Sequence, residues 1–128
     1  MITIKIKGGP TFTVSYTANM NAQMALEAVI QYPANKGLFS FMLQYYGTGL
    51  GYLVDMINGT YDTVTALSNT GQPYFFWDFV HNHHHADKGI DHTFLKDGDE
   101  IGFDYEMYVP EKHAGTHREA KFKSKAAL

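Results

Sequence analysis

Hydrophobic and polar residues alternate along two short runs at the start of the chain. In residues 2–7, Ile alternates with Thr and Lys, and in residues 11–16 Phe, Val and Tyr alternate with Thr and Ser. This period of two is typical of strands that bury one face. Because Gly8, Gly9 and Pro10 between the runs favour a turn, the sequence predicts an opening β-hairpin.

The spacing changes to that of a helix over residues 22–31, where strong helix formers place Met, Ala and Val at helical intervals. Asn19 or Asn21 is positioned to cap the first turn of this helix, and Pro33 to end it. A second segment, residues 38–46, is expected to be helical or irregular.

The rest of the chain is expected to consist of strands and turns. Residues 74–81 are the most apolar run and predict a central strand that is covered on at least one face. The other expected elements are strands over 52–57, 63–67 and 100–109, a loop over 68–73 and a tight turn over 96–99.

This order of elements predicts an α+β fold of the ubiquitin-like β-grasp type, in which a mixed sheet packs on one main helix behind an opening hairpin. The 128 residues are enough for one domain with a core. We expect that domain to span residues 1–109, and residues 110–128 to form a basic tail that is flexible or partner-dependent.

Charge and composition narrow the classes of function. Residues 1–109 hold five Lys and eleven Asp or Glu, a net charge of −6, whereas residues 110–128 carry +3. An acidic body argues against nucleic acid as the main partner. The chain has no cysteine, which excludes thiolate metal sites and disulfides. No apolar run is long enough for a membrane span and none has the form of a signal peptide, so a cytoplasmic protein without a membrane partner is the default expectation.

The most informative segment is residues 81–92, which contain five histidines and two aspartates. Imidazole and carboxylate are common ligands of divalent transition metals, and alternate residues of an extended segment point to one side. The segment therefore predicts a site for Zn, Ni, Cu or Fe. The expected ligands are His81, His83, His85, His92 and Asp87, with Asp91 as a further carboxylate. The alternative is a solvated loop whose histidines bind nothing.

The same histidines also suit proton transfer, because imidazole changes charge near neutral pH. His81 or His92 would act as a general base, and Asp91 or Asp78 would orient the ring. The sequence thus leaves open a small His-dependent enzyme, metal-dependent or not.

Aromatic residues make up 15% of the chain, a high proportion. Tyr46, Tyr52, Tyr74 and Trp77 could line a pocket for a flat or apolar small molecule. The alternative for Tyr74 and Trp77 is packing in the core. Because both faces of the run 74–81 are largely apolar, a third hypothesis is an interaction module that forms a homo-oligomer through this strand and binds no ligand.

Three segments give the chain a resemblance to a known family. They are Tyr46–Gly59, with its glycines and the ending Ile-Asn-Gly; Phe76–Asn82, with its Trp; and Leu95–Ile101, which reads Leu-Lys-Asp-Gly-Asp-Glu-Ile. Together they resemble the DUF4430 domain, which is related to the C-terminal domain of transcobalamin and intrinsic factor. The resemblance implies a β-grasp fold and ligand binding, with cobalamin as the ligand of the vertebrate carriers. Where that family has Gly after the Trp strand, this chain has His83 after Asn82, which predicts a longer, His-rich loop.

Overall fold

The opening hairpin and the helix form where the apolar spacing predicts them. In the computed structural model, which describes residues 1–63 and 74–108, strands β1 (Ile2–Ile6) and β2 (Thr11–Val14) pair antiparallel and helix α1 (Ala22–Gln31) follows. The Asn21 side chain accepts a hydrogen bond from the Met24 N–H at 2.9 Å, which caps the first turn. A short 3-10 helix, η1 (Pro33–Asn35), then ends the helical region.

The expectation of a helical or irregular segment over 38–46 is wrong in its middle. This segment contains strand β3 (Phe41–Tyr45), which pairs antiparallel with β4 (Tyr52–Ile57). Phe41 and Leu43 pack against the core from β3. Pairing with β4 and burial against the core outweigh the local conformational preference of this segment.

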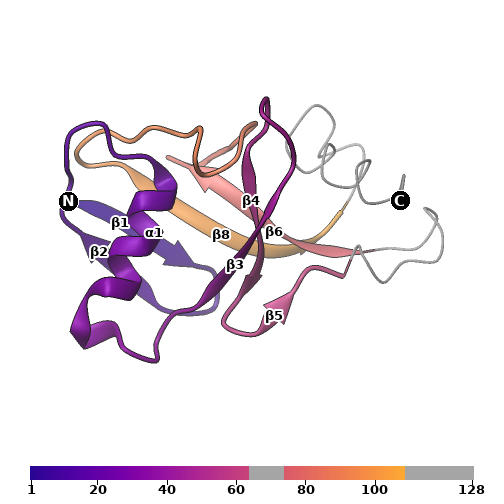
Figure 1. Cartoon of the computed structure of the whole chain (residues 1–128). Helices are drawn as coiled ribbons and strands as arrows, with labels where there is room; N and C mark the ends of the chain where they lie inside the picture. Colours follow the sequence, from indigo (N-terminus) through magenta and orange to yellow (C-terminus); the bar gives the residue numbers. More distant parts are fainter. Residues whose placement is uncertain (64–73, 109–128) are drawn as a thin grey trace.

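The remaining strands are β5 (Thr60–Tyr61), β6 (Phe75–His81), β7 (His84–His85) and β8 (Glu100–Met107). One sheet has the order β2-β1-β8-β6-β7 and the other β3-β4-β5. In the larger sheet β1 and β8 are parallel, and the other pairs are antiparallel, so the sheet is mixed. Figure 1 shows β8 crossing the molecule between β1 and β6. The predicted α+β class is therefore confirmed.

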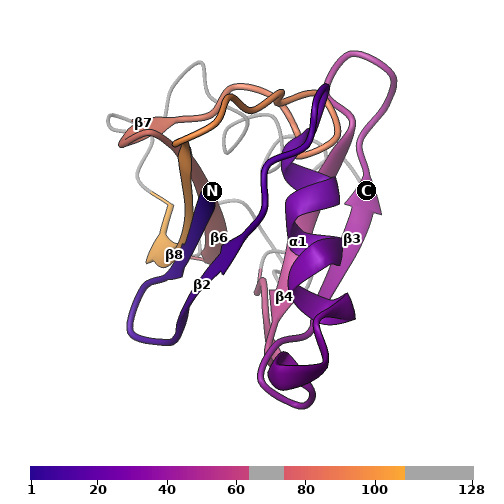
Figure 2. The ribbon, with the colours of Figure 1, turned by 90° about the vertical axis from the view of Figure 1, so that its left-hand side faces the viewer.

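The core lies between the larger sheet and a second layer made by α1 with β3 and β4, which Figure 2 shows edge-on. Each layer contributes one apolar face. The buried residues include Ile2, Ile4, Ile6, Phe12 and Val14 from the hairpin, Ala25, Leu26 and Val29 from α1, and Val54 and Ile57 from β4. The central strands add Trp77, Phe79, Ile101 and Phe103.

The opposite face of the larger sheet carries a smaller aromatic cluster and several polar groups. Tyr74 and Phe76 are buried there and pack with Tyr108. Asp78 follows Phe76 on this face at the alternating position, and it is also fully buried. The two faces of β6 thus differ in chemistry, and the contact between Asp78 and His85 described below lies on the face of Asp78.

Part of the predicted layout falls outside the described residues. Most of the expected strand over 63–67, the loop over 68–73 and the tail over 110–128 lie there. Within residues 1–63 and 74–108, no helix is long and apolar enough to cross a membrane.

Candidate functional site

The histidine-rich segment is a tight β-hairpin, and the expectation of a longer loop is wrong. His81 pairs with His84 and Val80 with His85, so only Asn82 and His83 form the turn between β6 and β7. Their φ angles are 48° and 68°. Two central residues with positive φ are the pattern of a type I′ turn, which Asn-Gly usually adopts. Asn and His both tolerate positive φ better than most side chains, so His83 can replace Gly here.

Asn82 holds this turn against the start of β8. Its side-chain oxygen accepts from the Glu100 N–H at 2.8 Å, and its amide nitrogen donates to Asp99 Oδ1 at 2.9 Å. The Asn82 N–H also donates to the Glu100 carbonyl. These contacts fix the hairpin relative to the sheet, so the imidazoles that it carries have defined positions.

Each of four histidines lies beside a different carboxylate. The nitrogen–oxygen distances are 2.8 Å for His81 and Asp99, 3.6 Å for His83 and Glu100, 3.0 Å for His85 and Asp78, and 3.7 Å for His92 and Asp91. The sequence predicted Asp87, Asp91 and Asp78 as the carboxylates beside the histidines. Asp91 and Asp78 do lie beside a histidine, whereas Asp99, in the turn before β8, and Glu100, the first residue of β8, were not predicted.

The structure does not gather the predicted metal ligands at one point. Within the described ranges, 1–63 and 74–108, no group of three or more His, Asp or Glu side chains is arranged to hold a metal ion. The chain reverses at Asn82 and His83, so the alternation that would align His81, His83 and His85 is broken by the turn. His92 lies on a separate segment with Asp91, and Asp87 is exposed.

His83 and Glu100 line a cavity of about 240 Å³ on the polar face of the sheet. The other described residues that line it are Lys5, Lys7, Val80, Gly102 and Asp104. The two carboxylate oxygens of Glu100 contact different residues: Oε1 lies 3.0 Å from Lys5 Nζ, and Oε2 lies 3.6 Å from His83 Nε2. The cavity therefore combines an exposed imidazole, carboxylates and two ammonium groups.

Asp78 and His85 form the pair with the most buried carboxylate of the four. The Asp78 side chain is fully buried, whereas that of His85 is 41% exposed. Asp78 also lies directly across from Asp104 of β8. A buried carboxylate beside one nitrogen of a histidine orients the ring, which is the arrangement found at general bases. Asp78 was expected to orient His81 or His92, but it pairs with His85.

His81 instead contacts Asp99, within a turn that satisfies this carboxylate from several sides. Burial acts to raise the pKa of Asp99. Hydrogen bonds from Asn82, from His81 and from the Lys96 N–H outweigh that effect, so the pKa lies below its usual value. His81 is thereby tied into the base of the hairpin and is only 28% exposed.

Asp91 and His92 are placed at a joint between the helix and β4. Asp91 Oδ1 accepts from the Tyr52 N–H at 2.8 Å, and the Asp91 carbonyl accepts from the Asn21 side chain at 3.2 Å. Gly51 has φ +86°, and a Cβ on it would lie 2.2 Å from Asp91 Oδ1. Asp91 thus has a packing role in the structure, beside its expected role in catalysis.

The four aromatic residues proposed to line a ligand pocket do not share one surface. Trp77 lies in the main core, where its Nε1 donates to the Thr60 carbonyl at 2.8 Å. Tyr74 belongs to the cluster on the other face, and Tyr52 packs against Tyr45 with ring centroids 5.0 Å apart. Burial, together with the nearby Asp55 and Asp62 charges, raises the pKa of the Tyr46 hydroxyl far above its usual value. Sequence reasoning missed Asp62, whose Oδ1 accepts from the Trp77 N–H at 2.9 Å.

Comparison with known proteins leaves the family open. No protein-family model matches this chain, and no curated protein matches it. Several solved structures do match it, among them a crystal structure from Ruminococcus gnavus ATCC 29149 of a protein provisionally described as metal-binding. That match has a TM-score of 0.47 and 12% identity, and it covers 84% of this chain and 95% of the other. The similarity is too low to support an argument about fold or ligand, so the DUF4430 resemblance stays a prediction.

Proposed function

We propose that this chain is a binding protein on a β-grasp scaffold, and that its ligand is a divalent transition-metal ion held at the β6–β7 hairpin. Over residues 1–63 and 74–108, the scaffold assignment is supported by an opening hairpin, one α-helix and a last strand that runs parallel to the first in the middle of the sheet. The metal would bind between His83 and Glu100, beside the cavity that these residues line.

The observation that carries this proposal is the distance of 3.6 Å between His83 Nε2 and Glu100 Oε2. It is too long for a good hydrogen bond. Two ligands of a tetrahedral zinc ion, each with a bond of about 2.1 Å, lie about 3.4 Å apart. The pair therefore needs only a small adjustment to chelate one ion. Since the ligands are an imidazole and a carboxylate, Zn, Ni, Cu and Fe are the fitting metals.

Two protein ligands leave the other coordination positions open to water or to a small molecule. Lys5 and Lys7 line the same cavity and would attract an anionic co-ligand. The sequence predicted binding of a metal or of a small molecule, and this arrangement would allow both, because the metal would hold the small ligand. Of the residues first expected to bind metal, the proposal retains His83 as a direct ligand.

Titration calorimetry of untagged, EDTA-treated protein with ZnCl₂ and NiCl₂ tests the proposal. We expect one binding event per chain, weakened at least about tenfold by His83→Ala and by Glu100→Gln. His84→Ala is the matched control, because His84 is an exposed neighbour in none of the four pairs. Equal losses in His84→Ala would indicate unspecific capture by clustered histidines, and absence of binding would reject the metal site.

A second candidate function rests on the 3.0 Å contact between His85 Nδ1 and Asp78 Oδ2. A buried carboxylate next to a partly exposed imidazole suits general-base chemistry, as in an activated-water hydrolysis. The test is hydrolysis of 4-nitrophenyl acetate as a function of pH. An enzyme would lose the rate in His85→Ala and keep it in His84→Ala, whereas equal rates in both variants and in buffer would exclude this function.

A further inference from the structure

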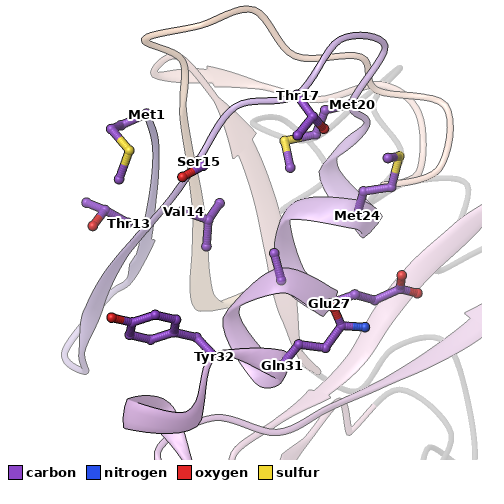
Figure 3. A pocket seen from close by; sticks show the side chains of 11 residues that line it. Met1, Thr13, Val14, Ser15, Thr17, Met20, Met24, Glu27, Gln31 and Tyr32 are labelled. Atoms are coloured by element: carbon purple, nitrogen blue, oxygen red, sulfur yellow. The ribbon is translucent and has the colours of Figure 1, made fainter.

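A groove lies between strand β2 and helix α1, away from the cavity that His83 and Glu100 line. It has a volume of about 680 Å³, within the range of ligand pockets. Figure 3 shows Val14 and Ser15 on one wall and Met20, Met24 and Glu27 on the other. Among residues 1–63 and 74–108 it shares none with the cavity beside His83, and its proposed function does not rest on the proposed metal site.

The β2 wall of this groove carries backbone groups directed away from the sheet. The Ile6 N–H donates to the Pro10 carbonyl at 3.1 Å. Hydrogen-bonded pairs alternate in an antiparallel ladder, so Ile4 with Phe12 and Ile2 with Val14 are the next bonded pairs. The N–H and C=O groups of Thr13 must therefore point to the outer edge of β2.

That outer edge lacks a paired strand in the part of the chain that the structure describes, where β2 is the first strand of its sheet. A strand edge with unpaired backbone groups is a template for a further strand. Thr13 and Ser15 both line the groove. The free backbone edge of β2 therefore forms part of the wall of the groove.

The wall formed by α1 and its flanking residues Met20 and Tyr32 is mainly apolar and carries one charge. Met20 is buried, and Met24 and Tyr32 are 41% and 62% exposed. Methionine side chains adapt to ligands of different shape, which makes them frequent at peptide-binding surfaces. Glu27 is the one charged side chain among the described residues of the lining, and it is in none of the ion pairs found in residues 1–63 and 74–108. The groove therefore favours an apolar group next to a cation.

We propose that this groove binds an extended peptide that adds a strand to the free edge of β2. Phe12 and Val14 point toward the helix, whereas Thr13 points away. In an added strand, the residue opposite Thr13 would exchange backbone hydrogen bonds with it, and the residues on either side would face α1. One of these would place an apolar side chain among the methionines, and the other a Lys or Arg near Glu27.

The geometry thus defines a recognition pattern: an apolar residue and a basic residue separated by one position. A small cationic molecule would use the methionines and Glu27 but would gain nothing from the backbone of Thr13. A second copy of this chain would pair β2 with β2 and present no basic group at the required place, since the β2 segment is Thr-Phe-Thr-Val. We therefore favour the peptide over both.

The probe is a capped heptapeptide, Thr-Thr-Leu-Thr-Lys-Thr-Thr, labelled with a fluorophore and followed by anisotropy. Its matched analogue carries an N-methyl group on the central Thr, which removes one backbone donor and changes no side chain. We expect binding that the N-methyl group weakens at least about tenfold, equivalent to about 1.4 kcal/mol. Equal binding of both peptides would overturn the added strand and indicate a small cationic ligand.

Two pairs of protein variants test the groove itself. Glu27→Lys should weaken binding at least about tenfold, whereas Asp87→Lys, the same charge change at an exposed site just after the β6–β7 hairpin, should not. Thr13→Pro removes an N–H that the added strand would use, and Thr13→Val is its matched control, because it changes the side chain and keeps the N–H. Loss of binding in Thr13→Pro with retention in Thr13→Val supports the proposal.

Sedimentation equilibrium at the concentration of the anisotropy assay tests whether a second copy of this chain occupies the groove. A dimer that the peptide dissociates would mean that a second copy of the chain covers the edge, and this would overturn the proposal. Failure to bind the peptide up to its solubility limit, in protein whose circular dichroism shows that it is folded, would do the same.

Discussion

The Nδ1 atom of His85 lies 3.0 Å from Oδ2 of Asp78, although the two residues are in different strands and Asp78 is fully buried. A buried carboxylate needs compensating partners, because burial without them is costly. His85 is one such partner, and it stands at the edge of the sheet where solvent reaches it. The pair links the stability of the hairpin to the chemistry that the hairpin can perform.

We therefore predict that His85→Ala lowers the free energy of unfolding by about 1–3 kcal/mol, because Asp78 loses a partner inside the protein. Urea denaturation at pH 7 measures this change, with His84→Ala as the control in the neighbouring exposed position. A double-mutant cycle with Asp78→Asn isolates the coupling between the two side chains. Additive effects of the two substitutions would show that the pair does not stabilise the fold.

Asp99 provides a prediction on pH dependence. Its pKa is lower in the folded state than its ordinary value, because hydrogen bonds favour the charged form despite burial. Its contribution to stability is therefore complete above the unfolded-state pKa of about 3.9, and it is lost as the pH falls through the lower folded-state value. Asp99→Asn should reduce the free energy of unfolding at pH 7 and have a smaller effect at pH 3.

Urea denaturation of the wild-type protein and of Asp99→Asn at pH 3 and pH 7 checks this expectation. Asp97→Asn is a suitable control, because Asp97 is exposed in the same turn and belongs to a different ion pair. If Asp99→Asn changes stability equally at pH 3 and pH 7, the effect comes from altered turn geometry, and the lowered pKa does not explain it.

The packing of residues 89–91 against the start of β4 should not tolerate an added methyl group at Gly89. A Cβ on Gly89 would lie 2.3 Å from the Tyr52 carbonyl oxygen and 2.7 Å from that of Leu50. Both are backbone atoms that hold the segment by hydrogen bonds from Gly89 and Ile90, so they cannot move without breaking the contact. Gly89→Ala should lower the free energy of unfolding by about 2–4 kcal/mol.

Gly49→Ala is the matched control, since no atom of the described residues lies within 4 Å of its added Cβ. Thermal unfolding of both variants by circular dichroism measures the difference. A Gly89→Ala protein as stable as Gly49→Ala would show that the segment 89–91 is not packed against β4 in solution.

Local patterns predicted those parts of the fold that depend on neighbours in sequence. The period of two in β1 and β2 and the helical spacing after Asn21 needed no distant partner. The same holds for β6, where the alternation separates Trp77 in the main core from Phe76 on the opposite face. By contrast, β3 could not be predicted, because its conformation depends on pairing with β4.

The candidate site depends still more on distant partners. Sequence identified the histidines, but their carboxylates Asp99 and Glu100 come from the turn and strand that β6 meets only after folding. The hairpin itself was missed because His83 occupies a position where Gly is usual. The groove between α1 and β2 had no sequence signal, since it arises from the distance between two elements and from the ladder register of one.

His83 offers a prediction that separates stability from function. Its φ of 68° is strained for a residue with a side chain, at a turn position that Gly occupies without cost. His83→Gly should therefore raise the free energy of unfolding by about 1 kcal/mol. The same substitution removes the imidazole at 3.6 Å from Glu100, so zinc binding should weaken at least about tenfold. Urea denaturation without metal and calorimetric titration with ZnCl₂ measure the two effects on one protein. A higher free energy of unfolding together with weaker zinc binding would mean that the His83 ring serves metal binding at the expense of stability. A more stable variant with unchanged zinc binding would leave the ring without a role in metal binding.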